Sequence, residues 1–387
     1  MIEFKVTDAQ KFFCLCLRHY DFLNEEEIRL LYTANGDQEL FNEAKLNGVV
    51  PIVAHALNKV IPGDLPDHWL AEYNVIDQRI QSYMVELDKV ASLLTKNGIP
   101  LLALKNSGIT RGMYPYYGAC PMGDIDVLVS KTSFRTAHKI LTDEGYQLKF
   151  RCPFEEDSLE AAEHGGGAEY SVNLPNGEHL WFELQWRPVA GRWIQPDQEP
   201  DADELISRSV PIEGSDVKLL APEDNLLQVA LHTAKHTFVR APGFRLHTDV
   251  DRIVSSQAID WPKFVQLTIE LRTKTAVFMS LAMAQSLLGT PIPFSVLEEL
   301  SPAKWKVKLM VAWLQRVGVF EPDASKWNKL GYIVFVSLLY DDFSDFVSGV
   351  LPRTETMKEQ YHFKSNWLLP YYHCKRLANL VLRRVNT

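Results

Sequence analysis

Two aspartates separated by a single residue form the pattern with the clearest chemical meaning in this sequence. They are Asp124 and Asp126, in the run Gly-Asp-Ile-Asp that starts at Gly123. In an extended chain alternate side chains point to the same side, so the two carboxylates would lie about 7 Å apart. Two like charges at that spacing favour a cation between them, and carboxylate oxygens suit Mg²⁺ or Mn²⁺. The alternative interpretation is a pair of solvated acids at a strand end, because the motif is short.

A possible anion-binding turn lies about twenty residues upstream. The apolar run Ile99–Leu104 predicts a buried strand, the segment Lys105–Gly108 a polar turn, and Ile109–Met113 a helix. Backbone N–H groups of such a turn and the dipole of the following helix attract phosphate, and Lys105 adds a positive charge. The alternative is an ordinary strand-to-helix turn in which Ser107 caps the helix.

The surrounding sequence predicts helices on both sides of a few strands. Apolar spacing predicts a long helix from about His68 to Lys96, ended by Asn97-Gly98. Strands are expected at Asp124–Val129 and in a hairpin of Ala168–Leu174 and His179–Arg187. The other expected helices are Glu25–Tyr32, Gln38–Asn47, Ile52–Val60, Thr132–Glu144 and most of the chain after Pro222.

This pattern predicts an α+β protein with a small mixed sheet as its core and helical regions before and after it. We expect an N-terminal helical region at residues 1–97, the α/β core at 98–190 and a C-terminal helical region at 191–387.

Composition excludes several classes of protein. The 387 residues are 46% apolar and carry a formal net charge of −9, which disfavours a non-specific nucleic-acid coat. The five cysteines include no Cys-x-x-Cys pair, so neither a zinc knuckle nor a disulfide framework is expected; they are Cys14, Cys16, Cys120, Cys152 and Cys374. We find no signal peptide and no apolar run long enough to span a membrane. A reduced, cytoplasmic protein is the simplest prediction.

The two motifs together resemble the nucleotidyltransferase superfamily of the DNA polymerase β type. More narrowly, the chain resembles a bacterial family of nucleotidyltransferases whose acceptors are mostly unassigned. The resemblance covers most of residues 45 to 295. It is carried by LALKNSGITRGMYP (102–115), CPMGDIDVLV (120–129), APEDNLL (221–227), HTAKH (232–236) and LLGTPIP (287–293).

The resemblance implies a set of site residues. It implies that Glu183, in the run Phe-Glu-Leu-Gln-Trp, joins Asp124 and Asp126 as a catalytic residue and as a ligand of Mg²⁺ or Mn²⁺. It also implies nucleotide binding by Lys105, Asn106, Ser107 and Gly123, and substrate binding by His232, Lys235 and His236. For Glu183 the alternative is a charged residue on an exposed strand. For His232 and His236 the alternative is a structural role in a packed helix.

Four positions depart from the pattern of that family. Asn106 replaces a glycine, Cys120 an arginine, Glu183 an aspartate and Gln185 a histidine. The predicted function is the transfer of a nucleoside monophosphate from a nucleoside triphosphate such as ATP, with release of pyrophosphate. The acceptor is an unidentified small molecule, peptide or protein. The departures support an alternative, a protein that keeps the fold as a binding or scaffold module without turnover.

Three other segments attract attention. Asp249 and Asp251 are interpreted as solvated or capping acids, because side chains two apart on a helix diverge. His164–Gly167 is interpreted as a plain loop. The basic segment from Cys374 to Arg384 predicts an amphipathic helix, which in the lowest-ranked hypothesis would contact a membrane surface.

Overall fold

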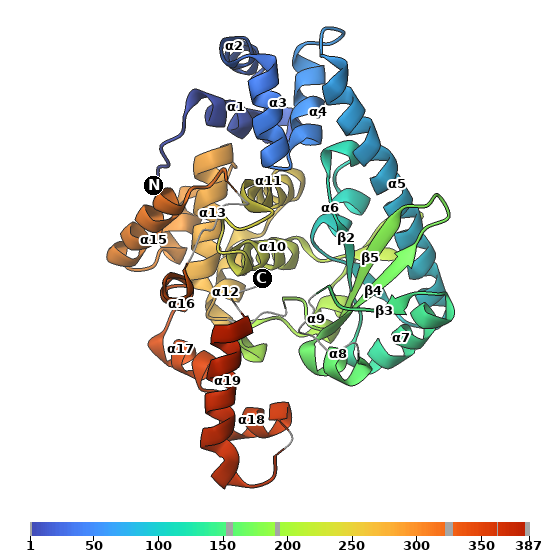
Figure 1. Ribbon diagram of the computed structural model, residues 1–387, viewed down its shortest axis with the longest axis vertical. Helices are drawn as coiled ribbons and strands as arrows, with labels where there is room; N and C mark the ends of the chain where they lie inside the picture. Colours follow the sequence, from blue (N-terminus) through green and yellow to red (C-terminus); the bar gives the residue numbers. More distant parts are fainter. Residues whose placement is uncertain (1, 152–157, 190–193, 322–327, 362, 384–387) are drawn as a thin grey trace.

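The computed structural model describes residues 2–151, 158–189, 194–321, 328–361 and 363–383 (Figure 1). The chain begins with helices, as predicted. The longest, α5, runs from Asp67 to Lys96 and ends where Gly98 takes a left-handed φ of 72°. The elements of this region are α1 (Asp8–Cys16), η1 (Tyr20–Phe22), α2 (Glu25–Asn35), α3 (Asp37–Leu46), α4 (Val50–Val60) and α5 (Asp67–Lys96).

The centre of the chain forms one mixed sheet of seven strands in the order β3-β4-β5-β2-β1-β7-β6. Strand β2 pairs with β5 and β1 pairs with β7 in parallel, and the remaining pairs are antiparallel. The strands are β1 (Leu101–Ala103), β2 (Asp124–Leu128), β3 (Gln147–Leu148), β4 (Gly167–Asn173), β5 (His179–Gln185), β6 (Val210–Pro211) and β7 (Val217–Leu219). The predicted α+β class and the hairpin of β4 and β5 are therefore confirmed.

Helices connect the strands and then continue to the end of the described chain. Those within the sheet region are α6 (Lys105–Gly112), η2 (Tyr117–Ala119), η3 (Lys131–Ser133), α7 (Phe134–Asp143), α8 (Leu159–Gly165), η4 (Pro196–Gln198) and α9 (Ala202–Ser207). Those that follow are α10 (Pro222–Lys235), η5 (Gly243–Arg245), α11 (Leu246–Ser256), α12 (Trp261–Glu270), α13 (Lys274–Leu288), α14 (Phe294–Leu300), α15 (Lys304–Val317), α16 (Lys329–Ser337), α17 (Phe343–Val350), α18 (Thr354–Tyr361), η6 (Asn366–Leu368) and α19 (Leu369–Arg383).

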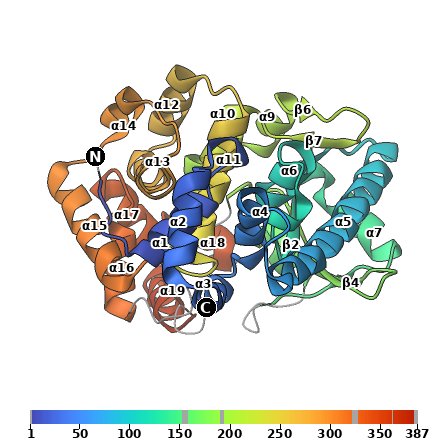
Figure 2. The same ribbon diagram turned by 90° about the horizontal axis from the view of Figure 1, so that it is seen from above.

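The helices before and after the sheet pack into one body. Buried apolar residues of both regions, such as Phe12, Leu57 and Met283, belong to the same core. A second core lies against one face of the sheet, where α5 and α7 cover residues such as Ile125 and Phe182. Figures 1 and 2 show the helical body on one side of the sheet and α5 and α7 on the other. The opposite face of the sheet carries a smaller apolar cluster, which includes Leu102, Leu128 and Leu205, so only part of that face can hold polar groups.

The segment between β1 and β2 differs from the prediction. Instead of a turn at Lys105–Gly108, helix α6 starts at Lys105 directly after the strand. Lys105 itself has a φ of 50°, which turns the chain sharply enough for the helix to begin there. Gly108 lies against β1, since a Cβ atom there would be 2.8 Å from the carbonyl oxygen of Ala103. The missing side chain lets α6 pack directly on the sheet.

Three more findings concern the sequence predictions. The expected loop at His164–Gly167 is the end of α8 and the start of β4, with Gly166 as a left-handed cap. Strands β6 and β7 belong to the sheet although they lie after residue 190, the predicted end of the α/β core. The division of the chain into three regions stays a prediction. Cys152 lies outside the described residues. In the part of the chain that the structure describes, every helix is too short or too polar to cross a membrane.

Candidate functional site

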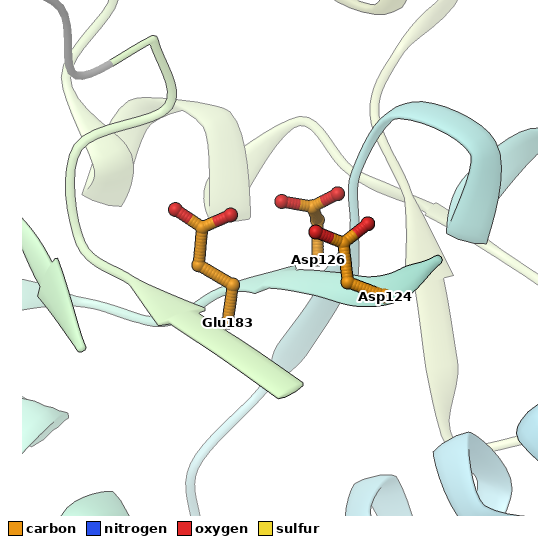
Figure 3. A group of neighbouring side chains, drawn as sticks. All are labelled: Asp124, Asp126 and Glu183. Carbon is orange, nitrogen blue, oxygen red and sulfur yellow. The ribbon is translucent and has the colours of Figure 1, made fainter. Parts of the chain in front are cut away.

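Three carboxylates converge on the sheet face that looks toward the helical body. The parallel pairing of β2 with β5 places Asp126 directly opposite Glu183, and Asp124 lies two residues earlier on the same face of β2. One oxygen of each side chain lies within 4.8 Å of the others. Figure 3 shows the three carboxyl groups rising from the same side of the two strands. Asp126 is buried, whereas Asp124 and Glu183 are half-buried.

A lysine neutralises the inner part of this acidic group. Lys105 is 9% exposed, and its Nζ lies 2.5 Å from an oxygen of Asp126 and 3.7 Å from an oxygen of Glu183. Burial opposes the charge on Lys105, but the two carboxylates raise the pKa of its ammonium group. Burial of Glu183 likewise opposes ionisation, yet the Lys105 ammonium and a bond to Asp126 lower the pKa of Glu183 below its usual range. Lys105 is therefore the internal counter-ion of the acids.

Two further side chains position Asp126. The hydroxyl oxygen of Ser107 accepts a hydrogen bond of 2.9 Å from the backbone N–H of Asp126, and Ser107 is fully buried. The amide of Gln185 donates to the same carboxylate oxygen that Lys105 contacts, at 3.0 Å. Burial raises the pKa of Asp126 well above its usual range against the opposing charge of Lys105, and the carboxylates of Asp124 and Glu183 add to that rise. Ser107 and Gln185 thus position Asp126, the acid whose ionisation burial opposes.

The other predicted nucleotide-binding residues lie around this group. Asn106 is half-buried in the first turn of α6. Gly123 is exposed immediately before β2, and a Cβ atom there would meet nothing within 4 Å. Their proposed contacts with a nucleotide stay a prediction.

The end of α10 faces the same acids. The surrounding protein and the ammonium of Lys105 lower the pKa of Lys235, and the charges of Glu183 and Asp126 oppose that shift. Burial and Lys105 also lower the pKa of His232 well below its usual range. The rings of His232 and His236 meet edge to face with centroids 4.8 Å apart. Lys235 therefore interacts with the charges of Glu183 and Asp126, whereas His232 and His236 interact with Lys105 and Lys235; substrate binding by the three residues stays a prediction.

His236 makes protein stability depend on pH. Burial and the charge of Lys235 lower the pKa of His236 to about 3, whereas the pKa of a histidine in an unfolded chain is about 6.5. The unfolded chain binds the extra proton between these values, so this contribution to stability is full above about pH 6.5 and is lost as pH falls. We expect the free energy of unfolding to fall less steeply below pH 6 in a His236→Gln variant, by up to about 1.4 kcal/mol per pH unit. Urea unfolding at pH 7, 6, 5 and 4 measures this, and equal slopes in both proteins would contradict it.

Sequence reasoning missed two arginines at the site. The guanidinium of Arg151 donates to Asp124 at 2.6 Å, and Arg151 also binds Glu169. Arg245, at the end of η5, interacts electrostatically with Asp249 and Asp124, whose charges oppose the lowering of its pKa by burial. Arg151 lies 27 residues from Asp124 and Arg245 more than a hundred, so only the folded chain reveals the pairs.

The interpretation of Asp249 and Asp251 as solvated acids is wrong. Only 3% and 2% of these residues are exposed, because α11 packs against other elements on more than one side. Asp251 accepts hydrogen bonds from the backbone of His19 and from the hydroxyl of Thr290. Burial raises the pKa of Asp249 to about 6, against the opposing charges of Arg252 and Arg245.

Three of the residues that depart from the family pattern lie at or near the acidic group or a buried arginine. The longer side chain of Glu183 still reaches the other two carboxylates, and Gln185 donates a hydrogen bond to Asp126. Cys120 is fully buried and lies near Arg252, whose guanidinium donates to the carbonyl of Ala119. A guanidinium from α11 thus lies beside the position at which the family pattern has an arginine.

The donor set fits a divalent cation of the magnesium type. Three carboxylates provide only oxygen donors, which Mg²⁺ and Mn²⁺ prefer. Two positively charged side chains, Lys105 and Arg151, contact these acids, which shows that the group attracts cations.

Comparison with known proteins agrees with the sequence resemblance. A family model described as "Uncharacterised nucleotidyltransferase" matches residues 33–289, about two thirds of the chain. The match includes β1 to β7, the three acids and α10 to α13. No curated protein matches the sequence.

Proposed function

The chain belongs to the uncharacterised nucleotidyltransferase family, and from that premise we propose that it transfers a nucleoside monophosphate from a nucleoside triphosphate to an acceptor. The observation that supports this most directly is the convergence of Asp124, Asp126 and Glu183 within 4.8 Å. A site that transfers a nucleotide must handle the negative charge of a triphosphate, and acids of this spacing hold the cations that do so.

In the proposed reaction, an acceptor hydroxyl attacks the α-phosphorus in line with the bond to pyrophosphate. The new oxygen–phosphorus bond forms as the bond to the leaving pyrophosphate breaks, and the carboxylate of Glu183 would accept the proton of the acceptor hydroxyl. Mg²⁺ or Mn²⁺ held by Asp124, Asp126 and Glu183 would neutralise the phosphate oxygens in this step.

The chain's own residues would divide the remaining work. Lys105 and the first turn of α6, with Asn106 and Gly123 beside it, would lie along the triphosphate. Lys235 would donate to phosphate oxygens from the opposite side. Burial lowers the pKa values of His232 and His236, so both rings are uncharged at neutral pH. Each ring then offers one hydrogen-bond donor and one hydrogen-bond acceptor to the molecule that receives the nucleotide.

A small molecule, a peptide or a protein with a free hydroxyl would fit this chemistry, and ATP is the first nucleotide to test. We place the reaction in the cytoplasm, where nucleoside triphosphates are available.

Calorimetric titration of ATP, CTP, GTP and UTP tests the proposal. With Mg²⁺ present we expect at least one of them to bind with a dissociation constant in the micromolar range, and removal of the metal with EDTA to abolish binding. Release of pyrophosphate from the bound nucleotide would favour an enzyme over a binding module. A chain that binds none of the four nucleotides in either condition would contradict both.

A further inference from the structure

Arg151 joins one of the three acids to a carboxylate outside the group. Its Nη1 donates to Asp124 at 2.6 Å. Its backbone N–H and its Nε both donate to one oxygen of Glu169, at 2.7 and 3.1 Å, and its Nη2 donates to the other oxygen at 3.3 Å. The guanidinium also lies over the ring of Trp181, 5.6 Å from its centre. Arg151 is therefore anchored through Glu169 and reaches Asp124 with a single nitrogen.

The contact with Asp124 is of the kind that a cation would replace. The side chains of Arg151 and Asp124 are 39% and 25% exposed, and ion pairs at such positions contribute little to stability. A divalent cation that also has Asp126 and Glu183 as ligands attracts Asp124 much more strongly. Glu169 does not belong to the group of three acids. Its hydrogen bonds with Arg151 would therefore keep the arginine in place after a divalent cation has bound Asp124.

Lys105 is not equivalent to Arg151. It is buried, it contacts Asp126 and Glu183, and it starts α6, so it belongs to the interior of the site. Arg151 approaches Asp124, whose side chain is 25% exposed. Of these two contacting cations, only Arg151 combines solvent access with an anchor outside the three acids.

We propose that Arg151 is a phosphate-binding residue of the nucleotide site, and that it neutralises Asp124 until a metal–nucleotide complex takes that carboxylate. The freed Nη1 then donates to a phosphate oxygen of the nucleotide, since a planar guanidinium matches phosphate geometry. This inference rests on the proposed function. It adds a residue whose hydrogen-bond partner changes from the carboxylate of Asp124 to a phosphate oxygen when the nucleotide binds.

This change of partner predicts that an Arg151→Gln variant binds Mn²⁺ more tightly and nucleotide more weakly than the wild type. Mn²⁺ alone should bind about two- to fivefold more tightly, because it no longer competes with an exposed ion pair. Mg-ATP and Mg-pyrophosphate should bind at least about tenfold more weakly, because a charged hydrogen bond to phosphate is lost. Both affinities can be measured by calorimetry, with thermal unfolding as a check that the variant is folded.

Arg135→Gln is the matched control. Arg135 binds Glu163 through its Nε and Nη2, as Arg151 binds Glu169, but it has no contact with the three acids. We expect both affinities to stay as in the wild type. Arg151→Lys should keep part of the nucleotide affinity, since it keeps the charge without the fork of donors.

Three results would overturn the inference. Unchanged nucleotide affinity in Arg151→Gln would mean that the arginine only competes with the metal. Weaker binding of both Mn²⁺ and nucleotide would mean that it merely positions Asp124. Failure of the wild type to bind either Mn²⁺ or any nucleotide would instead contradict the proposed function, and this inference with it.

Discussion

An Asp124→Asn variant is expected to bind Mn²⁺ at least about 100-fold more weakly than the wild type while it remains folded, a loss of about 2.7 kcal/mol. The substitution keeps the size of the side chain and removes the negative charge that a divalent cation needs. The Asp124 side chain is 25% exposed and pairs with Arg151, which is itself 39% exposed, so we expect stability to change by less than about 1 kcal/mol. Calorimetric titration with Mn²⁺ and urea unfolding measure the two quantities.

Asp143→Asn is a suitable control for this variant. Asp143 pairs with Lys139 one turn away at the end of α7, it does not belong to the group of three converging acids, and both side chains are exposed. The control should bind Mn²⁺ as the wild type does. Equal Mn²⁺ affinity in Asp124→Asn and the wild type would remove Asp124 from the metal site and weaken the proposed function with it.

The sequence predicts the framework of this site well, because the relevant signals are local. Strand periodicity places Asp124 and Asp126 on one face, and the structure agrees. Helical spacing and Asn97-Gly98 place α5 within a residue of its observed ends. The resemblance adds Glu183, whose pairing with Asp126 depends on sheet order that spacing does not reveal.

The remaining features depend on contacts between distant segments. The predicted turn at Lys105–Gly108 is wrong because Lys105 adopts a left-handed conformation and Gly108 allows α6 to lie on β1. The prediction that Asp249 is solvated is wrong because helical spacing describes a single helix and not the elements that pack against it. The contact of Arg151 with Asp124 cannot be read from either residue's neighbours, since it joins the segment after β3 to the start of β2.

Removal of the Lys105 charge is expected to have the largest effect on stability. In a Lys105→Met variant the carboxylates of Asp126 and Glu183 lose the ammonium that lies 2.5 and 3.7 Å away, and one of the two is buried. A buried charge left without its partner costs about 3–5 kcal/mol. Urea unfolding in EDTA should show a loss of this size. Lys89→Met is the control, because Lys89 also pairs with two acids, Glu86 and Glu144, but is 47% exposed. The buried Glu86 keeps its hydrogen bond from the hydroxyl of Tyr146, so this change should cost no more than about 1 kcal/mol.

The same variant separates a metal site from a purely structural ion pair. If the three acids bind a divalent cation, Mn²⁺ replaces the missing ammonium, and a ligand that binds only the folded state raises stability. Millimolar Mn²⁺ should therefore recover most of the stability lost in Lys105→Met, and should stabilise this variant more than the wild type. Ca²⁺-free buffers with K⁺ at equal ionic strength control for screening by salt.

A Lys105→Met protein that is as stable as the wild type in EDTA would show that Lys105 is not the counter-ion of the acids. One that is destabilised but gains nothing from Mn²⁺ would show that the three carboxylates do not act together on a cation.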